Sequence, residues 1–176
     1  WRLGIYKGKI QKAIDLLDRT LHIGKNKLGE NHLKVAGTYN SVGYLYSLAG
    51  QYEKALVNLN LSLSIRLPVL GKKHPIVAGT YNNIGEVYRI KGDYYKAFEN
   101  YNKCLSIWQD TYSGKHYYFY VIYNNMGNVF FRKGDYYTAL EYYRQSLSIS
   151  LENLASRHPD IAICYNNIGN VYNDMD

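Results

Sequence analysis

YNNIGEVYRIKGDYYKAFENY, residues 81–101, reappears at residues 123–143 as YNNMGNVFFRKGDYYTALEYY and at residues 39–59 as YNSVGYLYSLAGQYEKALVNL. Each copy begins 42 residues after the one before it. A fixed period of roughly 20 to 50 residues is the sequence signature of stacked repeat units. The sequence therefore predicts a solenoid built from one unit used several times.

Within each copy the apolar residues follow helical spacing. Tyr81, Ile84 and Tyr88 stand at i, i+3 and i+7, and Ala97, Tyr101 and later apolar residues continue the pattern on a second helix. Each unit is thus a helix pair. The predicted helices span about 9–26, 33–48, 52–69, 75–90, 94–110, 117–132, 136–153 and 160–174.

The turn inside each pair has its own residues. Gly92-Asp93 and Gly134-Asp135 supply a glycine for the left-handed residue after one helix and an aspartate that can cap the next. Gln51 and Lys9 hold the same position as these aspartates and are poor caps. We therefore expect the helices that start there to be looser.

Glycine also recurs inside the first helix of each pair, where it costs about 1 kcal/mol relative to alanine. Such a cost indicates that the partner helix comes too close for a side chain. The recurring glycines are Gly43, Gly85, Gly127 and Gly169. In two linkers, Pro75 and Pro159 stand where a new helix begins, because the missing amide hydrogen costs nothing there.

At these residues the sequence resembles the tetratricopeptide repeat, and its period and Gly-x-x-His-Pro linkers are similar to the kinesin light chain variety. The resemblance implies an all-α fold, a right-handed superhelical solenoid of antiparallel helix pairs whose first helices line a concave peptide groove. It covers residues 1–176 as a single array. Its parts are a partial repeat 1–32, the repeats 33–74, 75–116 and 117–158, and a partial repeat 159–176.

A polar stripe on the first helices is the candidate binding site, because in such arrays this flank faces the groove. An asparagine side chain offers a carbonyl and an amide, so it can pair with a peptide main chain of any sequence. Arginines can add charge-assisted contacts to an acidic group. The predicted groove residues are Asn40, Tyr44, Asn82, Glu86, Arg89, Asn124, Asn128, Arg132, Asn166 and Asn170.

The same side chains have a structural interpretation. The asparagines, together with Asn83, Asn125 and Asn167 beside them, could hold adjacent helices together, and Arg89 and Arg132 could be ordinary solvated helix ends. Both interpretations stay open at the level of sequence. The stripe contains no lysine, which argues against a clamp for chaperone tails.

Charge and composition limit the other functions. Residues 1–36 carry a net charge of +5 and the other residues only +2. Nucleic-acid binding through a basic N-terminal helix is therefore an alternative function, although it is not favoured. A purely architectural spacer is a second alternative. No nucleotide loop, hydrolase or metalloprotease motif occurs, which indicates no enzyme and no cofactor. Two distant cysteines and the lack of a membrane span indicate a cytoplasmic protein.

The linker histidines recur with the repeat, at positions 32, 74, 116 and 158. Neighbouring helices pack about 8 to 10 Å apart, so these rings cannot share a metal ion, and a structural role in the linkers is expected. The sequence starts in mid-repeat and stops after an unpaired helix, which predicts a fragment of a longer array. Tyr165, Ile168 and Tyr172 on that helix predict end-to-end self-association.

Overall fold

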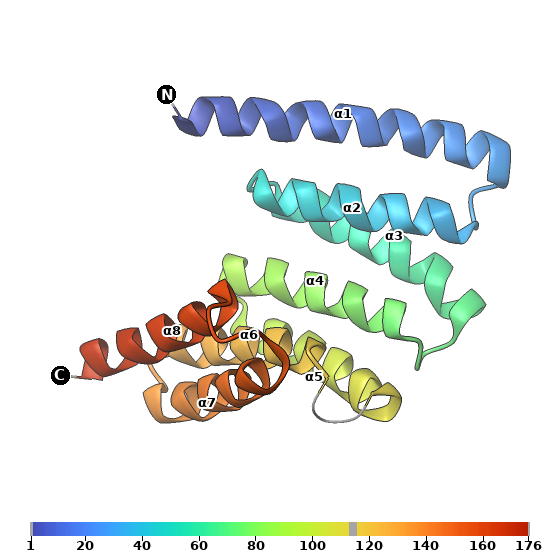
Figure 1. Cartoon of the computed structure of the whole chain (residues 1–176). Helices are drawn as coiled ribbons and strands as arrows, with labels where there is room; N and C mark the ends of the chain where they lie inside the picture. The colour runs from blue at the N-terminus through green and yellow to red at the C-terminus, as the bar shows by residue number, and fades with distance from the viewer. Residues whose placement is uncertain (1, 113–115, 176) are drawn as a thin grey trace. The chain divides into compact units, whose positions relative to one another are not determined.

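The computed structural model describes residues 2–112 and 116–175, and every regular element in these residues is an α-helix. The contacts divide the chain into two compact units, Trp1–Val87 and Tyr88–Asp176. The helices are α1 (Arg2–Leu28), α2 (Leu33–Leu48), α3 (Tyr52–Leu70), α4 (Pro75–Lys91), α5 (Tyr94–Thr111), α6 (Tyr118–Arg132), α7 (Tyr136–Asn153) and α8 (Pro159–Met175) (Figure 1).

The predicted helices agree with these bounds to within one residue at each end, except for the first. That helix was expected to start near residue 9, after a turn at Gly8-Lys9, and this was wrong because α1 runs on from Arg2. At Gly50 the equivalent turn forms, since α3 folds back onto α2 there. At Gly8 no such turn forms, and α1 continues through the glycine.

The turns inside the helix pairs are as predicted. Gly50, Gly92 and Gly134 have φ values of 75°, 83° and 78°, the left-handed region that glycine enters at no steric cost. The Asp93 and Asp135 carboxylates each accept a hydrogen bond at 3.2 Å from the main-chain nitrogen three residues later. Gln51 makes no such side-chain bond, so α3 begins without the cap that α5 and α7 have.

Close helix approach explains the glycines inside the first helices. A Cβ atom on Gly43 would lie 2.7 Å from Leu59 Cγ on α3, and one on Gly127 would lie 2.6 Å from the Tyr143 ring on α7. Both distances are shorter than any real contact, so these two pairs require glycine. A Cβ on Gly169 in α8 would meet nothing within 4 Å among the described residues.

The linker histidines cap the first helices. In each case the ring Nδ1 atom accepts a hydrogen bond from the main-chain nitrogen two residues later, at 3.1 to 3.3 Å. The residues are His32, His74, His116 and His158. Pro75 and Pro159 are the first residues of α4 and α8, as expected. The histidines therefore recur with the repeat because each one caps a helix. The sequence predicted a structural role for them in the linkers but not these hydrogen bonds.

Each unit has its own core. In the first, α1 packs on α2 and α2 on α3, around a cluster of Val35, Ala36, Tyr39 and Ile65. In the second, α6, α7 and α8 pack in sequence around Ala139, Leu140, Tyr143 and Val171. The fold is an all-α repeat solenoid, while the handedness of its superhelix and the predicted repeat boundaries stay predictions.

No described helix combines the length and the apolar character that a membrane crossing would require.

Candidate functional site

Asparagine side chains join the first helices of successive repeats. Asn83 on α4 donates from Nδ2 to Asn40 Oδ1 on α2 at 3.2 Å, and Asn167 on α8 donates to Asn124 Oδ1 on α6 at 2.8 Å. The second asparagine of one repeat thus donates to the first asparagine of the repeat before it. This supports the structural interpretation for Asn83 and Asn167. It also engages the carbonyl groups of Asn40 and Asn124.

The second unit contains a pocket of about 290 Å³ in which four of the predicted groove residues meet. We name it the arginine pocket. Arg89 comes from the last turn of α4, Arg132 from the last turn of α6, and Asn128 and Asn170 from equivalent places on α6 and α8. Its full lining is Arg89, Asn128, Phe131, Arg132, Tyr143, Asn167 and Asn170.

The buried ring of Tyr143 builds one wall of the arginine pocket. Because Gly127 lacks a side chain, this ring lies directly against α6, and its hydroxyl donates to Asn128 Oδ1 at 2.8 Å. The bond fixes the Asn128 carboxamide with its carbonyl toward α7. Its amide group is then the end that can donate to a ligand.

The pocket is electropositive. Burial raises the pKa of the Tyr143 phenol to about 12, although the charges of Arg89 and Arg132 act to lower it. The phenol therefore stays protonated at neutral pH and remains the donor to Asn128. Two guanidinium groups, which keep their charge at any physiological pH, face a space lined by amides rather than by carboxylates. Such an arrangement favours an anionic group.

The other predicted groove residues lie elsewhere. Asn40, Tyr44, Asn82 and Glu86 belong to the first unit, where the Tyr44 side chain is 48% exposed, and Asn166 is exposed on α8. The sequence did not indicate Tyr143 or Asn167 as pocket residues. Tyr143 has the pattern of a core aromatic residue on a second helix, and only the glycine opposite it on α6 hints that its hydroxyl reaches a first helix.

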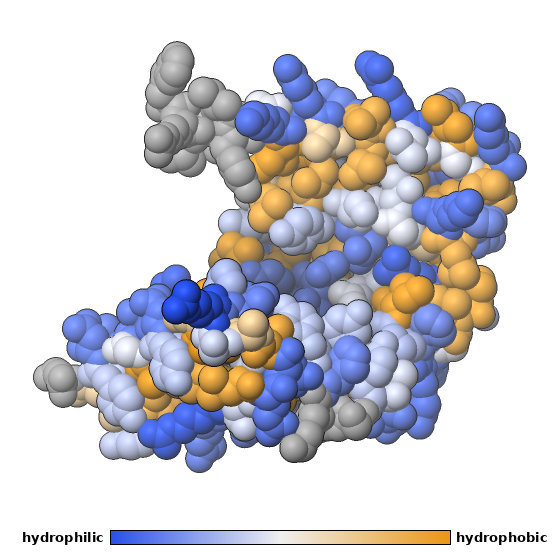
Figure 2. All heavy atoms as spheres, in the orientation of Figure 1, coloured by the Kyte–Doolittle hydropathy of each residue, from blue (hydrophilic) through white to orange (hydrophobic). Residues whose placement is uncertain are grey.

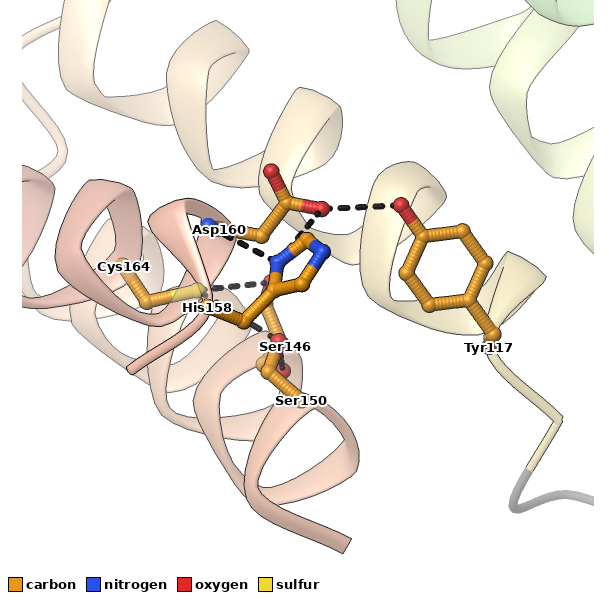
Figure 3. A network of polar contacts seen from close by, with 6 residues as sticks. All are labelled: Tyr117, Ser146, Ser150, His158, Asp160 and Cys164. Atoms are coloured by element: carbon orange, nitrogen blue, oxygen red, sulfur yellow. Dashed lines mark hydrogen bonds and ion pairs between the residues drawn. The ribbon is translucent and has the colours of Figure 1, made fainter. Parts of the chain in front are cut away.

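A second polar network joins the linkers before α6 and α8 (Figure 3). The Tyr117 hydroxyl donates to Asp160 Oδ2 at 2.8 Å, and Asp160 also lies 3.6 Å from His158 Nδ1. Burial, and then the bond to Asp160, raise the pKa of Tyr117. Tyr117 stands where the linkers before α4 and α8 have Pro75 and Pro159, and it connects its own linker to the next one.

The buried serines of the second helices differ between repeats. The Ser146 hydroxyl donates to the main-chain oxygen of Tyr120 at 3.0 Å and lies 3.4 Å from Cys164 Sγ (Figure 3). Ser62, the equivalent residue on α3, is also fully buried, but its hydroxyl has no hydrogen-bond partner among the described residues. One serine therefore stabilises its repeat and the other costs free energy.

Other kinds of site have little support. Across the described residues, no group of three or more His, Cys, Asp and Glu side chains is placed to hold a metal ion. The basic segment keeps Lys9 and Lys12 exposed on α1, while the side chains of Arg2 and Lys7 lie outside the described part of the chain. Trp1, residues 113–115 and Asp176, which the predicted array includes, lie outside it as well.

Comparison with known proteins identifies the fold. The nearly identical TPR-like repeats of a protein described as a kinesin light chain of Podosopora anserina match with a TM-score of 0.75 and 20% identity, covering 98% of this chain and 82% of that one. BtubC (BKLC) from P. vanneervenii matches with a TM-score of 0.82 and 23% identity, covering 98% and 68%. No curated protein matches by sequence.

A family model described as the tetratricopeptide repeat matches residues 5–67, 76–120 and 118–176. Together these segments span almost the whole chain, which confirms the resemblance found in the sequence. Repeats of this kind typically serve as non-catalytic protein-interaction modules. The chain belongs to the tetratricopeptide repeat family.

Proposed function

We propose that this chain binds an extended peptide segment of a partner protein and seats an acidic side chain of that peptide in the arginine pocket. The observation that carries the proposal is the convergence of Arg89 and Arg132 with Asn128 and Asn170 in one pocket. The biological role is then that of an adaptor or scaffold in the cytoplasm, similar to a kinesin light chain that holds its cargo.

The chemistry of the pocket suits a carboxylate. A guanidinium group presents a planar fork of donors that matches the two oxygens of a carboxylate, and charge-assisted bonds of this kind are about twice as strong as neutral ones. The amide groups of Asn128 and Asn170 can add further donors. One N–H of the Asn167 amide already donates to Asn124, so this side chain has at most one further donor for the ligand.

The remaining stripe residues are proposed as further peptide contacts within each unit. In the second unit, Asn124 and Asn166 would contact the peptide main chain beside the pocket. In the first unit, Asn40, Tyr44, Asn82 and Glu86 would contact a peptide main chain and its side chains. Asn166 is the best single test of this part, since it is exposed on α8. Asn40 and Asn124 are poorer tests, because their carbonyl groups accept bonds from the next repeat and their loss would also change stability.

The test is selection from a displayed library of random dodecamer peptides, followed by affinity measurement on the selected peptides and on copies with Asp and Glu changed to Asn and Gln. We expect the wild-type chain to select acidic peptides. The double variant Arg89→Gln/Arg132→Gln should bind them on the order of tenfold to hundredfold more weakly, since loss of a charge-assisted contact costs about 1.5 to 3 kcal/mol.

The matched control is Arg19→Gln/Lys72→Gln, which removes two exposed cations outside the pocket and changes the net charge equally. It should leave the affinity within about twofold at 0.15 M salt, because neither side chain lines the pocket and salt screens exposed charges. Equal binding by the pocket variant and the wild type would overturn the proposed site. Selection of peptides without acidic residues would overturn its chemistry.

The same measurements address the alternatives. Nucleic-acid binding through α1 predicts an affinity that falls steeply with salt and is lost when Lys7, Lys9 and Lys12 are neutralised. A purely architectural spacer predicts that no peptide is enriched above background and that Asn166→Ala changes nothing.

A further inference from the structure

Three helices contribute hydrogen-bond donors to the arginine pocket. Arg89 belongs to α4 and Asn170 to α8, while Asn128 and Arg132 both belong to α6. From α7, the Tyr143 hydroxyl donates to the Asn128 carbonyl, so the Asn128 amide is the end that can donate to a ligand. A ligand in this pocket therefore meets donors that converge from three helices.

A planar carboxylate has too few acceptor sites for this set of donors. Its two oxygens offer about four lone-pair sites, and two guanidinium forks that each donate two bonds fill all of them. The amides of Asn128 and Asn170 would then have to share sites that the arginines already occupy. A phosphate monoester has three terminal oxygens in a tetrahedral arrangement, so it can present one oxygen to each of the three helices.

Charge favours the same ligand. A phosphate monoester carries a charge of about −1.5 to −2 at pH 7, against −1 for a carboxylate. Among the described residues that line the pocket, two are arginines and none is acidic. The charges of Arg89 and Arg132 both act to lower the pKa of the Tyr143 phenol, so both reach the pocket wall. Figure 2 shows mainly hydrophilic residues, blue and pale blue, over α8, a surface that suits a strongly charged ligand.

We propose that the side chain which the arginine pocket binds most tightly is a phosphorylated serine or threonine of the partner peptide. This inference rests on the proposed function, because it requires that a peptide side chain enters the pocket. Clusters of arginine are a general means by which proteins recognise phosphorylated peptides. Phosphorylation of the partner would thus raise its affinity for this chain, and removal of the phosphate would lower it.

The test measures the binding of peptide pools to the whole chain by fluorescence polarisation at 0.15 M salt. The pools have the same random sequence, made without Ser, Thr, Tyr, Cys, Asp or Glu, and differ only in a central serine, glutamate or phosphoserine. The phosphoserine pool should bind on the order of tenfold more tightly than the glutamate pool, since one more bond to a charged acceptor is made. The serine pool should bind most weakly.

Asn170→Ala distinguishes a tetrahedral ligand from a planar one. It should weaken the binding of the phosphoserine pool about tenfold and that of the glutamate pool about twofold or less, because the arginines alone can fill the sites of a carboxylate. Asn173→Ala is the matched control on the same helix, since Asn173 is exposed, donates to Asp174 and does not line the pocket. It should change neither affinity. Circular dichroism checks that both variants are folded.

The arginine variants locate the binding. Arg89→Gln/Arg132→Gln should abolish the preference for phosphoserine, whereas Arg19→Gln/Lys72→Gln, with the same change in net charge, should keep it. Inorganic phosphate alone, added as a competitor, separates a peptide ligand from a free anion. It should displace the phosphoserine pool only at concentrations far above that of the peptide, because it lacks a peptide main chain.

The outcomes separate this inference from the proposed function. Equal affinity for the glutamate and phosphoserine pools, with both lost in the arginine pocket variant, would overturn the inference and leave the proposed function standing. Equal losses of both pools in Asn170→Ala would also overturn the inference alone. Binding of both pools that survives in the arginine pocket variant, or no binding of either pool, would overturn both. Displacement by inorganic phosphate at the concentration of the peptide would show that the ligand is a free anion.

Discussion

The repeats 33–74 and 117–158 use one scaffold for two different surfaces. Both place a glycine where the second helix approaches, Gly43 in one and Gly127 in the other. Both also accept the same asparagine hydrogen bond from the next repeat. Around these shared contacts the side chains diverge. Tyr143, Asn128 and Arg132 in the later repeat correspond to Leu59, Tyr44 and Leu48 in the earlier one.

This difference separates the residues that hold the fold from those that make a site. Leu59 fills the space beside its glycine as Tyr143 does, but it has no hydroxyl to orient a neighbour. Tyr44 and Leu48 are 48% and 44% exposed, so the earlier repeat presents apolar and aromatic surface where the later one presents cations and amides. The residues that recur with the period thus determine the packing, while the residues of the exposed surface differ between the repeats.

The largest expected effect on stability comes from replacing the glycines at which the two helices of a pair approach each other. Gly127→Ala places a methyl group 2.6 Å from the buried Tyr143 ring, so the free energy of unfolding should fall by about 1 to 3 kcal/mol. Gly43→Ala should also destabilise, since Ala55 carbonyl oxygen would lie 3.0 Å from the new atom. Urea denaturation of each variant measures both.

Gly79→Ala is the control for these two changes. Its Cβ meets nothing within 4 Å, so only the helix propensity changes, and stability should rise by up to about 1 kcal/mol. Equal shifts at the three positions would mean that close approach does not explain the glycines.

Most of the fold could be predicted because its determinants are local. The bounds of α2 through α8, the turn glycines and the caps at Asp93 and Asp135 all follow from short patterns that the period repeats. The start of α1 could not be predicted the same way. Gly8 stands at the position of the turn glycines, but α1 continues through it, so the short pattern alone does not end a helix.

A second prediction sets the two buried serines against each other. Ser62→Ala removes a buried hydroxyl that has no partner among the described residues, so it should stabilise the chain by about 1 kcal/mol. Ser146→Ala removes the bond to the Tyr120 carbonyl and should destabilise it by a similar amount. Thermal or urea unfolding compares the two, and shifts of the same sign would contradict the assignment.

The smallest effect concerns the hydroxyl that only the later repeat has. Tyr143→Phe removes the bond to Asn128 and should cost about 1 kcal/mol at neutral pH. Tyr137→Phe, at an exposed site, should change nothing measurable. A cost as small for Tyr143 as for Tyr137 would mean that the bond does not stabilise the fold.

This cost should depend on pH with a definite sign. The Tyr143 pKa is about 12 in the folded chain and about 10 when exposed, so the folded state holds its proton more tightly. The resulting stability is fully present below pH 10 and is lost as pH rises toward 12. Stability should therefore fall less for Tyr143→Phe than for the wild-type chain over this range, provided both stay folded.

The candidate site was only partly predictable. Helical spacing placed Asn128 and Asn170 on one stripe, and Arg89 and Arg132 at the ends of their helices, and the structure brings these four into the arginine pocket. Spacing could not show that Tyr143 reaches across from α7, since a tyrosine at a core position normally serves packing. Nor could it show that each asparagine bond runs from the second asparagine of one repeat to the first of the preceding one.

That direction has a consequence for how the array can change in length. A bond between side chains 43 residues apart pairs position n of one repeat with position n+1 of the next. Removing residues 75–116 would therefore bring Asn125 to the place of Asn83, opposite Asn40, and the same donor would meet the same acceptor. Duplication of residues 75–116 would preserve the hydrogen bond in the same way. Whole repeats can therefore be gained or lost by recombination while the same asparagine pair forms where the repeats join.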